Sequence, residues 1–254
     1  MTKSEKQQRP IKDILLDGDG FELGDGLLTL GGERNRRFMQ CREAEGDSAR
    51  SAPANDLRGK NGPRIGVLAI QGNYASHAQA LIEAGATPVE VRKPEQLASL
   101  DGLVLPGGES TTMLKFLKLR FFHALEEFCG SKPVFGTCAG AILLAREVIN
   151  PAQRSLGLLD AVVERNAYGR QIDSAIVTAQ TALAGGPLEM VFIRAPRIVS
   201  VGPGVEILAE RDGFPTLVRE GRILAATFHP ELSSDRRVHR LFVEAVEANI
   251  LNPS

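Results

Sequence analysis

Two short segments of this 254-residue chain carry residue types that can act together as a nucleophile and a base. Gly136-Thr137-Cys138-Ala139-Gly140 has the Gly-x-Cys-x-Gly form of a nucleophile elbow, a tight turn between a strand and a helix. We expect the Cys138 sulfur to stand exposed at the tip of this turn, where the N–H groups of the helix N-terminus favour the thiolate. A lone cysteine is more often a buried, small apolar residue, so the pentapeptide alone leaves both interpretations open.

The second segment, His229-Pro230-Glu231, supplies a base and a group to orient it. Pro230 keeps His229 extended, and residues i and i+2 of an extended segment point the same way. Glu231 is therefore expected to hold one ring nitrogen of His229 while the other nitrogen faces Cys138. The other histidines and cysteines are interpreted as surface or core residues: His77, His123 and His239, with Cys129 in the core and Cys41 exposed near the N-terminus.

Apolar runs predict the elements that position these segments. The elbow lies between the apolar runs 132–135 and 141–145, which indicate a strand and a buried helix. Upstream, the spacing predicts a β-α-β-α-β pattern, and right-handed crossovers then give a doubly wound, mostly parallel α/β sheet of flavodoxin-like type, flanked by helices. The expected strands are 64–71, 88–91, 102–105, 161–166, 191–194 and 223–228, and the expected helices include 74–84 and about 234–249.

A glycine pair ends one of these strands, in Pro106-Gly107-Gly108-Glu109-Ser110-Thr111-Thr112. Glycines allow the backbone to present N–H groups inward, so Gly108 is a candidate for half of an oxyanion hole, with the N–H of Ala139 as the second donor. Ser110 or Thr111 is the expected N-cap of the following helix. A plain structural turn also uses Gly-Gly, and Arg165 and Arg194, each at a strand end, are equally consistent with solvated side chains.

Composition limits the class of protein. Hydrophobic residues make up 43% of the chain, the net charge is −1, and aromatic residues are 5% with no Trp, so nothing indicates nucleic-acid binding. Three widely spaced cysteines without a C-x-x-C pair indicate neither a disulfide framework nor a metal site. Without a signal-like or membrane-spanning apolar run, we expect a cytoplasmic protein with no membrane partner.

The first 62 residues differ from the rest. They are highly charged and rich in glycine, with only short apolar runs, and we expect this polar extension to be disordered. The composition of residues 46–62 indicates a linker. The domain that carries the chemistry is expected to span residues 63–254.

The elbow, the Gly-Gly loop and His-Pro-Glu, in this order, resemble the class I glutamine amidotransferases. The chain is more specifically similar to one family, the glutaminase subunits of pyridoxal 5'-phosphate synthase (PdxT type), over residues 64–249. The segments that carry this similarity, besides the elbow and residues 228–232, are 65–72, 105–113, 163–166 with 169–171, and 192–196. The extension is the one departure from the family, which ordinarily begins at the first strand.

The resemblance implies a Cys138–His229–Glu231 triad that hydrolyses L-glutamine to glutamate and ammonia without a metal or cofactor. It implies that the oxyanion is held around Gly108 and Ala139. It further implies a set of residues that bind the substrate glutamine: Gly108, Glu109, Ser110, Arg165, Ile193 and Arg194.

The resemblance also implies a partner. This is a barrel-type pyridoxal 5'-phosphate synthase subunit (PdxS type), in a ring-shaped hetero-oligomer, that uses the ammonia. We expect the loop at Gln71-Gly72 to couple the two subunits. Two alternatives stay open: an amidotransferase subunit of another pathway, such as histidine biosynthesis, and a non-catalytic scaffold of the same fold.

Overall fold

The computed structural model describes residues 62–165, 167 and 174–253 of the chain. Its centre is a seven-stranded sheet in which five neighbouring strands are parallel and two strands at one edge are antiparallel. This confirms the predicted doubly wound, mostly parallel α/β fold. The spatial order is β10 (Glu206–Arg211), β11 (Phe214–Glu220), β12 (Ile223–Ala226), β4 (Val134–Thr137), β3 (Gly102–Leu105), β1 (Arg64–Leu68) and β2 (Thr87–Val91).

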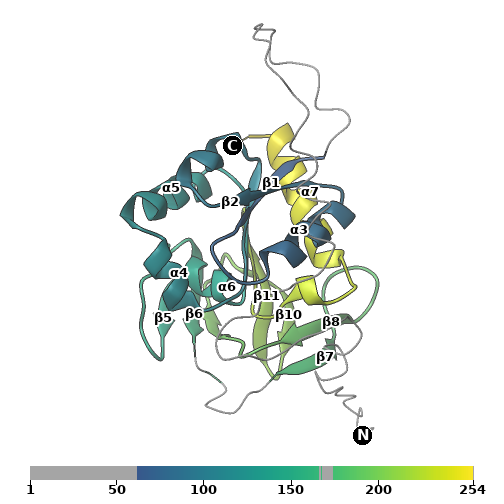
Figure 1. The fold of residues 1–254 in the computed structure, drawn as a ribbon. Helices are drawn as coiled ribbons and strands as arrows, with labels where there is room; N and C mark the ends of the chain where they lie inside the picture. The colour runs from purple at the N-terminus through teal and green to yellow at the C-terminus, as the bar shows by residue number, and fades with distance from the viewer. Residues whose placement is uncertain (1–61, 166, 168–173, 254) are drawn as a thin grey trace, which may run out of the picture. The chain divides into compact units, whose positions relative to one another are not determined.

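Helices cover both faces of this sheet (Figure 1). Helices α3 (Tyr74–Glu83) and α7 (Arg237–Leu251) pack on one face, and α4 (Ser110–Phe116), α5 (Leu119–Cys129) and α6 (Ala139–Leu144) pack on the other. Successive side chains of a strand point to opposite faces. In β3, for example, Val104 belongs to the core beneath α7 and Leu105 to the core beneath α5. The central parallel strands β1, β3, β4 and β12 are therefore largely apolar, as expected for strands buried on both faces, whereas the edge strand β2 contains Thr87 and Glu90.

Two smaller groups of strands flank the central sheet. The first is a three-stranded sheet of β5 (Ala145–Ile149), β6 (Leu159–Glu164) and β9 (Arg197–Val201), which packs into the α5-side core. The second is an antiparallel pair, β7 (Ala175–Ala179) and β8 (Leu188–Phe192), which contributes to the α7-side core. Short 3₁₀ turns, η2 (Pro94–Ser99) and η3 (Pro230–Leu232), complete the described elements.

Several local predictions were wrong. The expected strands 64–71 and 223–228 end at Leu68 and Ala226, and the expected strand 191–194 lies earlier, at Leu188–Phe192 in β8. The helix after the elbow ends at Leu144, and Ala145 already begins β5, so the apolar run 141–145 is divided between two elements. The N-cap of α4 is Glu109, not Ser110 or Thr111, because the Glu109 carboxylate accepts hydrogen bonds from the backbone N–H groups of Thr111 and Thr112. The C-terminal helix runs over 237–251 and so lies slightly later than expected.

The expectations for residues 1–61, including Cys41, lie outside the described residues, as do Asn166 and residues 169–171. No helix within the described ranges has both the length and the apolar character needed to span a membrane.

Candidate active site

The predicted site residues follow the carboxyl ends of adjacent parallel strands. β4 pairs with β12 so that Thr137 lies opposite Ala226, and with β3 so that Gly136 lies opposite Leu105. The chain leaves these strands into the elbow, the His-Pro-Glu segment and the Gly-Gly loop. The sheet register therefore brings three segments that are distant in the sequence to one edge, which is where ligands bind in open α/β sheets.

Cys138 has the backbone of a nucleophile elbow. Its φ of 49° and ψ of −104° lie outside the usual regions for a non-glycine residue, and its N–H donates to the Ala226 carbonyl oxygen at 2.8 Å. The turn is closely packed, since a Cβ on Gly140 would lie 1.9 Å from the Leu105 carbonyl oxygen. Cys138 is only 6% exposed, so the expectation of an exposed sulfur was wrong.

His229 is fixed from two sides. Its backbone N–H donates to the Val191 carbonyl oxygen of β8 at 2.8 Å, and its Nδ1 lies 2.8 Å from Glu231 Oε1. Burial lowers the pKa of His229, but the charges of Cys138 and Glu231 and side-chain hydrogen bonds to both raise that pKa well above its ordinary value. The imidazolium is thus stabilised between a sulfur and a carboxylate. The predicted grouping of Cys138, His229 and Glu231 is present in the structure.

The loop between β3 and α4 approaches both catalytic candidates. A Cβ on Gly107 would lie 2.4 Å from His229 Cε1 and 3.3 Å from Cys138 Cβ. The sequence analysis assigned the role in this loop to Gly108, which has a φ of 143°, and gave none to Gly107. Ala139, the other oxyanion-hole candidate, is the first residue of α6, where a helix leaves its N–H groups without intrahelical partners.

The Glu231 carboxylate is fully buried and has polar neighbours on both oxygens. Asn73 Nδ2 donates to Oε1 at 3.5 Å, and His77 Nε2 lies 3.2 Å from Oε2. Burial raises the pKa of Glu231, but the opposing effects of the nearby His77 and His229 are stronger and lower this pKa to about 2. The sequence analysis left His77 as a surface or core residue; the structure buries it, and the sequence analysis missed this contact. Its only signal in the sequence is its place in the helix that follows the first strand end.

Two of the predicted glutamine-binding residues contact each other. Arg165, just after β6, lies with Nη2 3.6 Å from Glu109 Oε1. Burial raises the pKa of Glu109, but hydrogen bonds from the side chains and backbone of Thr111 and Thr112 lower it to about 2. Glu109 therefore carries a negative charge while it caps α4, and Arg165 provides a positive charge beside it.

The remaining predicted binding residues are differently placed. Ser110 is buried and donates to Gln153 Oε1 at 2.8 Å, a partner that the sequence analysis did not single out. Ile193 is half-buried and Arg194 is exposed with a φ of 44°, directly after β8, the strand whose Val191 binds the His229 backbone. The described contacts join Arg165 to Glu109 but do not join Arg194 to either residue.

The Gln71-Gly72 segment lies against the Gly-Gly loop. The Gln71 side-chain amide donates to the Glu109 carbonyl oxygen. Gly72 has a φ of 80°, and a Cβ there would lie 1.8 Å from the Gly107 carbonyl oxygen. This segment therefore packs directly against the loop that follows β3.

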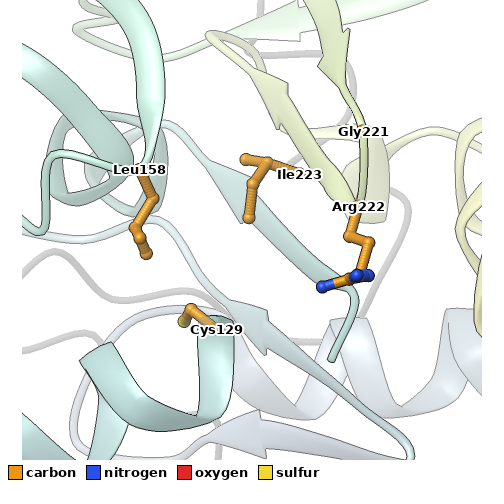
Figure 2. Close-up of a pocket in the computed structure, with 5 residues that line it drawn as sticks. All are labelled: Cys129, Leu158, Gly221, Arg222 and Ile223. Atoms are coloured by element: carbon orange, nitrogen blue, oxygen red, sulfur yellow. The ribbon is translucent and has the colours of Figure 1, made fainter. Parts of the chain in front are cut away.

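A separate pocket of about 400 Å³ lies away from this cluster (Figure 2). It is near the amino end of β12 and the C-terminus of α5, whereas the catalytic candidates follow the carboxyl ends of the strands. Burial raises the pKa of its Cys129 to about 12, so this thiol is not activated. Its lining residues are Cys129, Leu158, Gly221, Arg222 and Ile223. Within the described ranges, no group of His, Cys, Asp and Glu is arranged to hold a metal ion.

The fold and this cluster define the class I glutamine amidotransferase type. A crystal structure described as a glutamine amidotransferase is 45% identical to this chain and superposes with a TM-score of 0.68, covering 72% of this chain and 98% of the other. Residues 67–248 match the SNO glutamine amidotransferase family. This chain belongs to that family, as the motifs indicated.

Two curated relatives carry the same name, pyridoxal 5'-phosphate synthase subunit PdxT. The relative from Koribacter versatilis is 61% identical over 183 residues, which are 72% of this chain and 95% of the relative. The relative from Solibacter usitatus is 55% identical over 187 residues, which are 71% of this chain and 97% of the relative. This chain therefore covers almost the whole length of both relatives.

Proposed function

We propose that this protein is the glutaminase subunit of a pyridoxal 5'-phosphate synthase and hydrolyses L-glutamine through Cys138, His229 and Glu231. The observation that carries the proposal is the buried cluster itself: a cysteine in a strained elbow, with the His229 pKa raised by Cys138 and Glu231. The names of the relatives support the pathway. The assigned domain is residues 63–254.

In the proposed reaction, the Cys138 thiolate attacks the side-chain amide carbon of glutamine and forms a C–S bond. The resulting oxyanion accepts hydrogen bonds from backbone N–H groups around Gly108 and Ala139. The His229 imidazolium protonates the amide nitrogen, the C–N bond breaks, and ammonia leaves. A water molecule then attacks the thioester carbon through its oxygen, and neutral His229 takes a proton from this water. The C–S bond breaks, glutamate leaves, and the proton restores the thiolate–imidazolium pair.

Substrate binding is assigned to the charged groups beside the loop. Arg165 is suited to the α-carboxylate, because a guanidinium binds a carboxylate through paired hydrogen bonds. The ionised Glu109 is suited to the α-ammonium group, together with backbone near Gly108 and Ile193, while Ser110 and Arg194 complete the set. The 3.6 Å contact between Arg165 and Glu109 supports a common binding region for both ends of an amino acid.

In this proposal the ammonia passes to a barrel-type synthase subunit in a ring-shaped complex. Gln71-Gly72 is the proposed segment that couples the two subunits. Its support is the hydrogen bond from Gln71 to the Glu109 backbone and the tight approach of Gly72 to Gly107. A docked subunit that moves this segment would adjust the loop that holds the oxyanion.

The test is ammonia release from glutamine by the purified full chain, with and without the synthase subunit. Cys138→Ala is the inactive variant, and Cys129→Ala is the matched control, because Cys129 is also buried but lies outside the cluster. Release that needs Cys138, survives Cys129→Ala and rises with the synthase supports the proposal. Release that ignores the synthase would assign the ammonia to another pathway, and no release under either condition would favour a scaffold.

A further inference from the structure

A second group of buried polar residues lies next to the Glu231 carboxylate. His77 on α3 and His239 on α7 are both fully buried, and His77 Nδ1 lies 3.1 Å from His239 Nε2. His77 Nε2 lies 3.0 Å from Thr137 Oγ1 and 3.2 Å from Glu231 Oε2. A chain of polar contacts thus runs from Glu231 through His77 to His239 in the core. The proposed reaction uses neither of these two histidines.

We propose that His77 is a positioning residue that holds the Glu231 carboxylate for His229, and that His239 fixes the tautomer in which His77 does so. The inference rests on the proposed function of the Cys138 cluster and deepens it. Apart from its 3.2 Å approach to His77 Nε2, Glu231 Oε2 has no hydrogen-bond partner among the described residues. His77 is therefore the group that compensates this buried oxygen.

The contacts select one tautomer for each ring. If His77 carries its proton on Nε2, that N–H faces Glu231 and Thr137, and Nδ1 accepts from the Nε2–H of His239. The His239 Nδ1 is then a bare nitrogen, and it is buried without a partner among the described residues. The opposite arrangement would bury an unpaired N–H on His239 and turn the His77 lone pair toward the carboxylate, and each of these is costly.

The charges around the rings agree with this assignment. Burial lowers the pKa of His77, Glu231 opposes this, and His229 adds to it. Burial likewise lowers the pKa of His239, to about 3, with His77 and Arg236 acting in the same direction and Glu231 opposing. Both rings are neutral at neutral pH, so each has one N–H, and the single negative charge of Glu231 is left to stabilise the His229 imidazolium.

The two imidazole rings are also restrained by packing against an aromatic side chain. Phe135 of β4 meets both imidazoles edge to face, with ring centroids 6.3 Å from His77 and 5.9 Å from His239 and interplanar angles of 88° and 83°. Neither histidine can turn freely in this packing. An orienting group behind a catalytic carboxylate needs such a fixed direction.

The first experiment compares His77→Leu, which removes the N–H, with His77→Gln, which keeps an amide donor at similar reach. His123→Gln is the matched control, because His123 lies on the exposed face of α5 and pairs with Glu126. Two quantities are measured on the full chain: kcat and KM for glutamine, and the pH dependence of Cys138 alkylation by iodoacetamide, read by mass spectrometry of the Cys138 peptide. Alkylation needs neither glutamine nor the synthase, so it tests the positioning role even if the glutaminase assignment fails.

We expect His77→Leu to lower kcat about 10- to 100-fold with KM within about twofold, because a buried carboxylate oxygen then loses the polar group that compensates it. The pH of half-maximal alkylation should rise, because a misplaced Glu231 no longer stabilises the thiolate–imidazolium pair. His77→Gln should restore most of both properties, and His123→Gln should change neither. A folded His77→Leu variant with unchanged kcat and an unchanged alkylation profile would overturn the proposal.

A second measurement uses the unmodified protein and so does not depend on whether a variant folds. Two-dimensional ¹⁵N–¹H spectra of the imidazole rings distinguish the two neutral tautomers from the charged ring, and the chain has 4 histidines to assign. His77 and His239 should both be neutral Nε2–H tautomers at neutral pH. An Nδ1–H tautomer or a charged ring at His77 would contradict the assigned arrangement.

Discussion

At the scale of single residues, the charge on Glu231 is central to the proposed role of His229 as a base. Its pKa of about 2 means that it is ionised throughout the range in which enzymes are assayed. We expect Glu231→Gln to lower kcat by about 10²-fold or more, because a neutral amide neither stabilises the imidazolium nor fixes its tautomer. Rate measurements between pH 6 and 9 test this, and an activity within threefold of the unaltered protein would refute a role for the carboxylate.

Gly107 gives a second prediction at this scale. Its added Cβ would lie 2.4 Å from His229 Cε1, so Gly107→Ala must displace either the loop or the base. We expect the variant to fold and to lose at least about tenfold in kcat, since small misplacements of catalytic groups carry large costs. Gly130→Ala, far from the cluster, is the control. Comparable losses of activity in both variants would show that the Gly107 contact is not specific.

The residue types of the cluster were readable from the sequence because elbow and His-Pro-Glu spacing are local patterns. The contacts of His77 and Gly107 were not, since both depend on how α3 and the β3–α4 loop pack on strand ends distant in the sequence. The N-cap of α4 was also misassigned. Its hydroxyl residues are good caps, but the Glu109 carboxylate reaches two N–H groups and two hydroxyls at once.

At the scale of elements, close packing of α6 on the central sheet determines the elbow. A Cβ on Gly140 would lie 1.9 Å from the Leu105 carbonyl oxygen, which is backbone of a central strand and cannot move aside. We expect Gly140→Ala to lower the free energy of unfolding by about 3 kcal/mol or more, at the upper end for overpacked cores. Chemical denaturation measures this loss.

Gly130→Ala is the matched control for this element as well. Gly130 has a φ of −66°, and the atom nearest to a Cβ added there would be the Glu127 carbonyl oxygen, at 3.4 Å. The substitution should leave stability unchanged or raise it by less than about 1 kcal/mol, because alanine restricts the unfolded chain. A Gly140→Ala protein as stable as Gly130→Ala would show that α6 can shift away from β3.

Periodicity predicted the positions of the central parallel strands well because these strands are largely apolar on both faces and bounded by glycines or prolines. It predicted α6 poorly, because an apolar run of this length fits a helix and a strand equally. The boundary at Ala145 is set by pairing with β6, where Ala145 lies opposite Leu159, and that partner lies in a later part of the chain.

At the scale of the whole molecule, the buried histidines make stability depend on pH. The folded pKa of His239 is about 3, against an ordinary value of 6.5. Between these values the unfolded chain binds a proton that the folded chain does not, so stability falls as pH falls through this window. The contribution is lost progressively below about pH 6.5, with a slope of at most about 1.4 kcal/mol per pH unit for one group.

His239→Gln should therefore flatten the dependence of unfolding free energy on pH between about 6.5 and 5. This interval lies above the range in which protonation of Glu231 lowers stability, which runs from its ordinary value of 4.5 down to about 2. Urea unfolding at several pH values gives the slope of unfolding free energy against pH for the unaltered protein and for His239→Gln. Equal slopes would mean that His239 takes up its proton in the folded protein as readily as in the unfolded chain.

The register of β4 between β3 and β12 also has a consequence for synthesis. Cys138 is made well before His229, and β12 can join the sheet beside β4 only after the chain has been extended past residue 226. A growing polypeptide on the ribosome thus carries Cys138 without His229 beside it while residues 139–228 are being made. Under the proposed function, a chain that ends before β12 would release no ammonia, so activity would require that the central sheet is complete.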